Sequence, residues 1–100
     1  MTYRVEVRRG VSDYLRGLEG MTRAGRLALF GFVDALRDYG DEAREGCPRR
    51  TPDSSVFHLR WTFDAGPAIR SLDLYVDDSE AADGLLQVLY ADLVPLPEEG

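Results

Sequence analysis

The residues best suited to chemistry begin in a basic loop, within the stretch CPRRTPDSSVFHLRWTF. Arg49 and Arg50 lie between Pro48 and Pro52, and the two prolines exclude regular helix. Guanidinium groups stay charged at neutral pH and bind phosphate through paired N–H donors. The loop is therefore a candidate site for a phosphate or another anionic partner. The alternative is a solvated connection.

A strand with an alternating pattern follows the loop. Residues 56–63, VFHLRWTF, put apolar side chains on one face and His58, Arg60 and Thr62 on the other. Imidazole titrates near neutral pH, so His58 is a candidate proton-transfer group, whereas Arg60 would hold a phosphate. The alternative for His58 is a hydrogen-bonded strand histidine.

Two residues further along the chain complete the candidate set. Arg70 would add another positive charge, and Tyr90 is a candidate stacking or catalytic group, or else a core or interface tyrosine. The acidic run at 77–83 matches no calcium-binding loop and suits a helix N-terminus. One Cys and one His make a zinc site very unfavourable. The sequence predicts neither a metal site nor a cofactor.

The first elements that would support these residues are a strand and a short helix. The alternation of residues 3–8 predicts a half-buried strand that ends at Gly10. Ser12 is a plausible N-cap for a short helix over residues 12–20.

A longer helix is predicted next. Thr22 is its candidate N-cap, and the apolar periodicity covers residues 23–39. Gly40 is the predicted C′ residue, which follows the end of the helix. Residues 41–46 leave room for one further turn. Because only a few residues join this helix to the previous one, the two predict a helical hairpin.

The second half of the chain predicts strands. Residues 68–76 alternate like residues 56–63, and the DAGP sequence between them has turn chemistry, so the pair predicts a β-hairpin. Residues 79–93 fit both a helix and a strand. We favour a short helical turn near 79–82, followed by a strand with Leu86, Val88 and Tyr90 on one face.

These elements predict one α+β domain over residues 1–94, in the order β-α-α-β-β-β, with a C-terminal tail at 95–100. The sheet is expected to be rich in antiparallel pairs, with a helical hairpin on one face. No apolar run of about eighteen residues and no secretory leader is present, so we expect a cytoplasmic protein without a membrane partner.

The charge is uneven along the chain. All twelve basic residues are arginines, and the net charge is −6. Residues 1–50 hold ten arginines against eight acids, or +2, and residues 51–100 hold two against ten, or −8. The negative net charge opposes generic nucleic-acid binding, because such binding depends on neutralising the phosphates. Only a local basic surface could then bind a nucleic acid.

The opening MTYRVEVRRGVSDYLRGL, the helix GRLALFGFVDALRDYG, the arginine-rich loop and three closing strands resemble the RelE/ParE superfamily of toxins from bacterial toxin–antitoxin modules. The resemblance implies the same fold, a toxin-like function, and a cognate antitoxin as partner. RelE-like members cleave mRNA on the ribosome, and ParE-like members poison DNA gyrase. By position, Arg49, Arg50, Arg60 and Tyr90 resemble the family's functional residues.

The chain also departs from the family pattern. It is acidic and lacks lysine, and its last strand LLQVLYADL carries neither arginine nor histidine. A second reading is therefore a non-catalytic interaction domain that forms a homodimer through its exposed sheet face.

Overall fold

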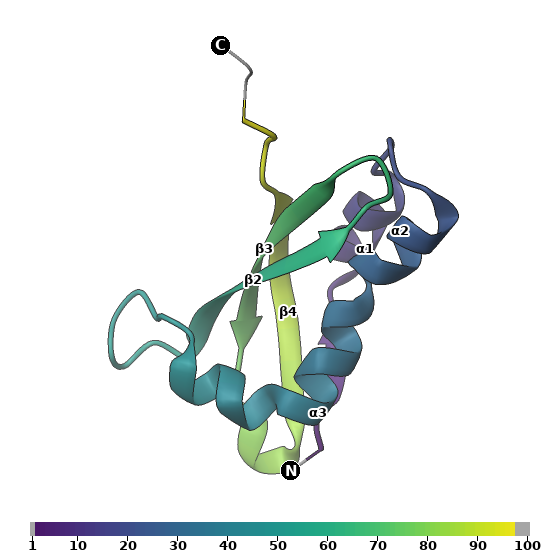
Figure 1. Cartoon of the computed structure of the whole chain (residues 1–100). Helices are drawn as coiled ribbons and strands as arrows, with labels where there is room; N and C mark the ends of the chain where they lie inside the picture. The colour runs from purple at the N-terminus through teal and green to yellow at the C-terminus, as the bar shows by residue number, and fades with distance from the viewer. Residues whose placement is uncertain (1, 98–100) are drawn as a thin grey trace.

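The computed structural model describes residues 2–97 and has the predicted α+β architecture (Figure 1). Its elements are, in chain order, β1 (Arg4–Val7), α1 (Arg9–Arg16), α2 (Arg23–Leu29), α3 (Gly31–Gly46), β2 (Val56–Asp64), β3 (Ile69–Asp77), the 3-10 turn η1 (Ala81–Asp83) and β4 (Leu85–Leu93).

The four strands form one mixed sheet in the order β1-β4-β3-β2. The strands β2, β3 and β4 are antiparallel neighbours, whereas β1 pairs with β4 in parallel. The hairpin register places Phe57 opposite Val76 and Trp61 opposite Leu72. The predicted hairpin and the antiparallel-rich sheet are therefore confirmed.

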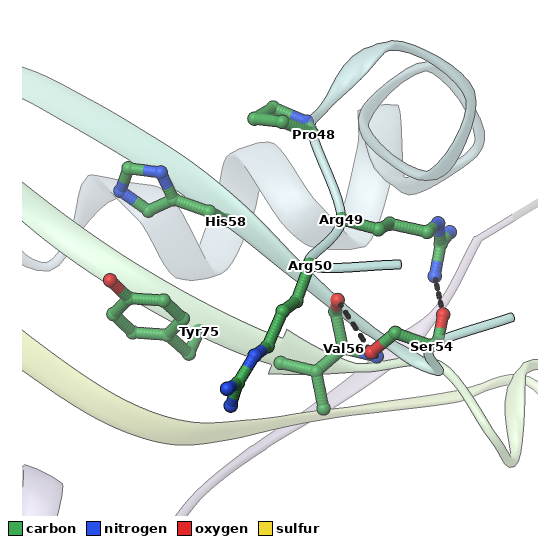
Figure 2. Close-up of a pocket in the computed structure, with 7 residues that line it drawn as sticks. All are labelled: Pro48, Arg49, Arg50, Ser54, Val56, His58 and Tyr75. Atoms are coloured by element: carbon green, nitrogen blue, oxygen red, sulfur yellow. Dashed lines mark hydrogen bonds between the residues drawn. The ribbon is translucent and has the colours of Figure 1, made fainter. Parts of the chain in front are cut away.

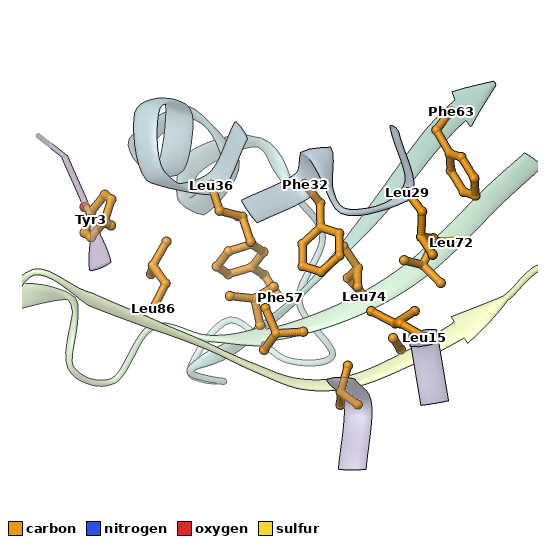
Figure 3. Close-up of a cluster of buried hydrophobic side chains, with 14 of the residues drawn as sticks. Tyr3, Leu15, Leu29, Phe32, Leu36, Phe57, Phe63, Leu72, Leu74 and Leu86 are labelled. Carbon is orange, nitrogen blue, oxygen red and sulfur yellow. The ribbon is translucent and has the colours of Figure 1, made fainter. Parts of the chain in front are cut away.

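The helices cover one face of this sheet. The helix α1 contacts β4, α2 contacts β2, and α3 reaches both β1 and β2. Between helices and sheet lies the core shown in Figure 3, in which Phe32 and Leu36 of α3 meet Phe57 and Leu74 from the strands. All four are at most 1% exposed. Because the apolar faces of the strands turn toward the helices, their polar faces form an open surface on the other side.

The helix boundaries differ from the sequence prediction in several places, including the first helix, which spans Arg9–Arg16 rather than residues 12–20. The helix α1 begins at Arg9 rather than after Ser12, and it has no side-chain N-cap. The second predicted helix is divided at Phe30 into α2 and α3, whereas its predicted N-cap is confirmed, since Thr22 Oγ1 accepts from Gly25 N at 3.0 Å.

The helix α3 is kinked at Tyr39, whose φ of −122° and ψ of 24° are not helical, so the predicted helix end at residue 39 falls on a break between two helical segments. The helix α3 continues to Gly46, as the alternative of a further turn allowed. A Cβ atom on Gly40 would lie 2.5 Å from the ring of Tyr3, so the residue is small because β1 packs closely against α3. Gly40 lacks the left-handed backbone of a C′ glycine, because the described glycines with positive φ are Gly20, Gly66 and Gly84, so close packing rather than capping explains this glycine.

The segment before β4 forms the 3-10 turn η1, and a strand follows, as we favoured. The predicted face of Tyr90 was wrong. Leu86 and Val88 are buried, but Tyr75 lies opposite Tyr90 and Val76 opposite Val88, so Leu89 is an extra residue in β4. This β-bulge reverses the alternation and turns Tyr90 to the open face.

Candidate functional site on the open sheet face

The open face of the sheet carries a compact group of polar and aromatic residues. His58 lies opposite Tyr75, and Arg60 lies opposite Asp73, in alternate cross-strand pairs of β2 and β3 that share one face of the sheet. On the next strand Tyr90 lies opposite Tyr75. The structure therefore brings together the three residues predicted as catalytic, His58, Arg60 and Tyr90.

Asp73 is the centre of this group. Its Oδ1 accepts from Arg60 Nε at 2.8 Å, and its Oδ2 accepts from Arg60 Nη2 at 3.2 Å. His58 Nε2 lies 2.8 Å from the same Oδ1. The hydrogen bond from Arg60 lowers the pKa of the Asp73 carboxyl, and the contact with His58 lowers it further, while burial acts in the opposite direction. Asp73 is thus a carboxylate at neutral pH.

An aromatic row lies beside this carboxylate. The rings of His58 and Tyr75 are stacked, with centroids 5.1 Å apart and planes inclined by 18°. Tyr75 and Tyr90 meet at 5.8 Å and 54°. Tyr90 is 56% exposed and Tyr75 is 39% exposed, so both rings present surface to solvent. Exposed aromatic faces on an open sheet can stack on nucleobases.

A pocket of about 650 Å³ opens between the basic loop and the strands. Figure 2 shows its lining, which consists of Pro48, Arg49, Arg50, Ser54, Val56, His58 and Tyr75. Arg50 is exposed and makes no hydrogen bond or ion pair with any residue in the described range 2–97. Its charge is therefore available to an anionic ligand in the pocket that His58 also lines.

Arg49 points away from Arg50, toward Ser54 (Figure 2). Its Nη2 lies 2.7 Å from Asp78 Oδ2 and also donates to the carbonyl of Arg44 at 2.9 Å, while Nη1 donates to the carbonyl of Ser54 at 3.0 Å. The guanidinium also lies 5.4 Å from the ring centroid of Phe57. These contacts use both terminal nitrogens and hold the side chain against the fold, so the adjacent arginines have different roles.

Arg70 lies apart from the group. It is opposite the buried Phe63 in the hairpin register, which places it on the helix-covered face. Its Nη2 donates to the carbonyl of Val94 at 3.2 Å. The structure does not bring it together with His58 and Arg60.

Sequence reasoning missed Asp73 and Tyr75 as members of the site. The alternation of residues 68–76 does put both on the polar face of their strand. The alternation does not give the pairing register of the two strands. That register places Asp73 opposite Arg60 and Tyr75 opposite His58.

Residues 2–97 contain neither a candidate metal site nor a candidate membrane-spanning helix. No group of three or more His, Cys, Asp or Glu side chains there could hold a metal ion. No helix in the same range has both the length and the apolar content needed to cross a bilayer.

No protein family, no curated protein and no solved structure matches the chain in sequence or fold comparisons.

Proposed function

We propose that this chain is the toxin-like component of a toxin–antitoxin pair and that its open sheet face binds and cleaves single-stranded RNA. The observation that carries the proposal is the position of His58, the chain's one histidine. It is held by Asp73, stacked on Tyr75, and lines the pocket together with Arg50, which has no hydrogen bond or ion pair within residues 2–97. This arrangement supplies a proton-transfer group, a phosphate-binding cation and stacking surfaces.

The reaction would be an internal transfer within the RNA. His58 accepts the proton of the 2′-hydroxyl, the O2′–P bond forms, and the P–O5′ bond breaks. The leaving 5′ oxygen takes a proton from water. Arg50 stabilises the negative charge on the phosphate oxygens during this step. The products are a 2′,3′-cyclic phosphate and a free 5′-hydroxyl, and neither a metal nor a cofactor is required.

The proposed partners are an antitoxin and the translating ribosome. An antitoxin would block the open face, because a segment that lies over the pocket covers His58 and Arg50 together. Acidic side chains on that segment would pair with Arg50, which has no partner within residues 2–97.

The test is growth after induced expression in bacteria. We expect arrest by the wild type, relief by His58→Gln or Arg50→Ala, and continued arrest by Arg23→Ala. Arg23 is the matched control because it is an exposed arginine in α2, on the side of the helices. A rapid stop in protein synthesis with new RNA 5′-hydroxyl ends supports the proposal. A DNA-damage response with intact mRNA would contradict RNA cleavage and indicate gyrase as the target.

A non-catalytic domain that dimerises through its sheet is the second candidate. It is favoured by the apolar surface on the open face, where Ile69 is 61% exposed and Tyr90 is 56% exposed. Light scattering of the purified chain separates the two readings. A stable dimer that Tyr90→Asp converts to a monomer, combined with unimpaired growth on expression, would favour this candidate over the toxin.

A further inference from the structure

The arrangement of His58, Asp73 and Arg60 assigns different tasks to its members. The Asp73 side chain is the least exposed of the three, at 21%, against 32% for His58 and 56% for Arg60. Arg60 clamps both carboxylate oxygens, and His58 contacts one of them. The two hydrogen bonds from Arg60 therefore fix the orientation of the carboxylate that contacts the imidazole.

The carboxylate determines the tautomer of the imidazole. An ionised carboxylate can only accept hydrogen bonds, so Nε2 of His58 must be the nitrogen that carries the proton. In the neutral ring Nδ1 then keeps its lone pair. No hydrogen bond to Nδ1 is formed by any group in residues 2–97, and the side chain lines the pocket.

Building on the RNA cleavage proposed above, we infer that Asp73 and Arg60 are positioning residues, which hold His58 with its proton on Nε2 so that Nδ1 receives the 2′-hydroxyl proton. Arg60 then acts through Asp73 and does not bind the phosphate. Its Nε and Nη2 donors are already directed at the carboxylate. The countercharge for the substrate comes from Arg50, whose donors are unused within the described residues.

The proton balance of the step follows from this geometry. Nδ1 takes the proton as O2′ bonds to phosphorus, and the imidazolium that forms carries protons on both nitrogens. Asp73 stabilises that cation through the existing hydrogen bond from Nε2, in the way a carboxylate supports the histidine of a hydrolase triad. Once the 5′ oxygen has left with a proton from water, the imidazolium returns its extra proton to solvent.

A first experiment uses NMR on the free protein and requires no RNA. Because the chain has one histidine, its ring signals are unambiguous. In the wild type we expect a hydrogen-bonded proton on Nε2. Asp73→Ala, Asp73→Asn and Arg60→Ala should speed its exchange with water about tenfold or more, since a hydrogen bond to a charged group is weakened or lost.

The matched control is Thr62→Ala. Thr62 pairs with Ser71 through their hydroxyl oxygens, 3.0 Å apart, on the same two strands and the same face. Its removal should leave the Nε2 proton unchanged. If Arg60→Ala also leaves that proton unchanged, Arg60 does not hold the dyad and the inference is wrong.

A second experiment separates rate from binding, with a single-stranded oligoribonucleotide, free and on ribosomes, as substrate. Asp73→Ala and Arg60→Ala should lower kcat about 10- to 100-fold, with KM changed less than about twofold. Arg50→Ala should instead raise KM. A raised KM with unchanged kcat for Arg60→Ala would make Arg60 a phosphate ligand and overturn the inference. If the wild type cleaves no RNA, the proposed function fails, and the exchange measurement alone then decides whether Asp73 and Arg60 position His58.

Discussion

Arg49→Ala should lower the free energy of unfolding by about 2–3 kcal/mol, because this side chain anchors the basic loop to the fold. It bonds Asp78, whose side chain is 9% exposed, and the carbonyls of Ser54 and Arg44. Removing one partner of a buried ion pair costs about 3–5 kcal/mol. Asp78 keeps the Nε of Arg44 at 3.1 Å, so we expect a loss below that range.

The measurement is urea unfolding at pH 7, followed by the fluorescence of Trp61, the one tryptophan of the chain. In a domain of this size, 2 kcal/mol corresponds to a fall in Tm of about 8–16 °C. The control is Arg50→Ala, which removes the same charge from the adjacent position. It has no partner within residues 2–97, so its stability should stay within about 0.5 kcal/mol of the wild type.

The pH dependence gives a second check. Burial raises the pKa of the Asp78 carboxyl, but the hydrogen bonds from Arg49 and Arg44 outweigh it and leave that pKa below the ordinary value. A carboxyl with a lowered folded pKa contributes stability above its unfolded pKa, about 3.9, and loses it as the pH falls through the folded value. The difference between wild type and Arg49→Ala should therefore shrink on acidification below about pH 5.

Two outcomes would refute this reasoning. One is an Arg49→Ala variant as stable as the wild type at pH 7, which would mean that the loop is not anchored by this ion pair. The other is a stability difference that stays constant down to pH 3, which would mean that the loss comes from packing against Phe57 rather than from Asp78.

Three further predictions concern the support of the site. Gly25→Ala should destabilise the fold by about 1–3 kcal/mol in urea unfolding, because its Cβ would lie 2.1 Å from the carbonyl oxygen of Ala65. The control Gly10→Ala, with no atom within 4 Å, should be neutral or stabilising by up to about 1 kcal/mol. Thr22→Ala removes the N-cap of α2 and should lower the unfolding free energy by about 1–2 kcal/mol by the same assay. Tyr90→Ala should weaken oligoribonucleotide binding about 5- to 100-fold in fluorescence anisotropy, as loss of one stacked base does, with little change in stability. Unchanged binding would exclude stacking on Tyr90.

The fold was predictable where periodicity alone decides the outcome. The alternation of residues 56–63 and 68–76, with turn residues between them, specifies a hairpin with one apolar face, and the structure has it. The N-cap at Thr22 was equally predictable. Threonine is a favoured N-cap residue because its hydroxyl oxygen accepts a hydrogen bond from a backbone N–H of the first helical turn.

Features that depend on partners distant in sequence could not be predicted. The extra residue Leu89 reverses the face of Tyr90, and only the pairing with β3 reveals it. Likewise, nothing local distinguishes Arg49 from Arg50. Their different roles follow from the position of Asp78, which comes from a loop 29 residues further along the chain.

The charge distribution yields a last prediction about how the site meets RNA. Affinity for single strands falls with log salt at a slope of about −0.7 for each phosphate contact. Arg50 is the one cation at the pocket without a partner in residues 2–97, so we expect a slope near −0.7, or roughly a threefold weakening between 50 and 200 mM salt. Such a site binds free RNA weakly, and the net charge of −6 adds repulsion. Efficient cleavage then requires a partner that presents the RNA, such as the ribosome. A measured slope steeper than about −2 would show that further arginines contact the phosphates and would remove that requirement.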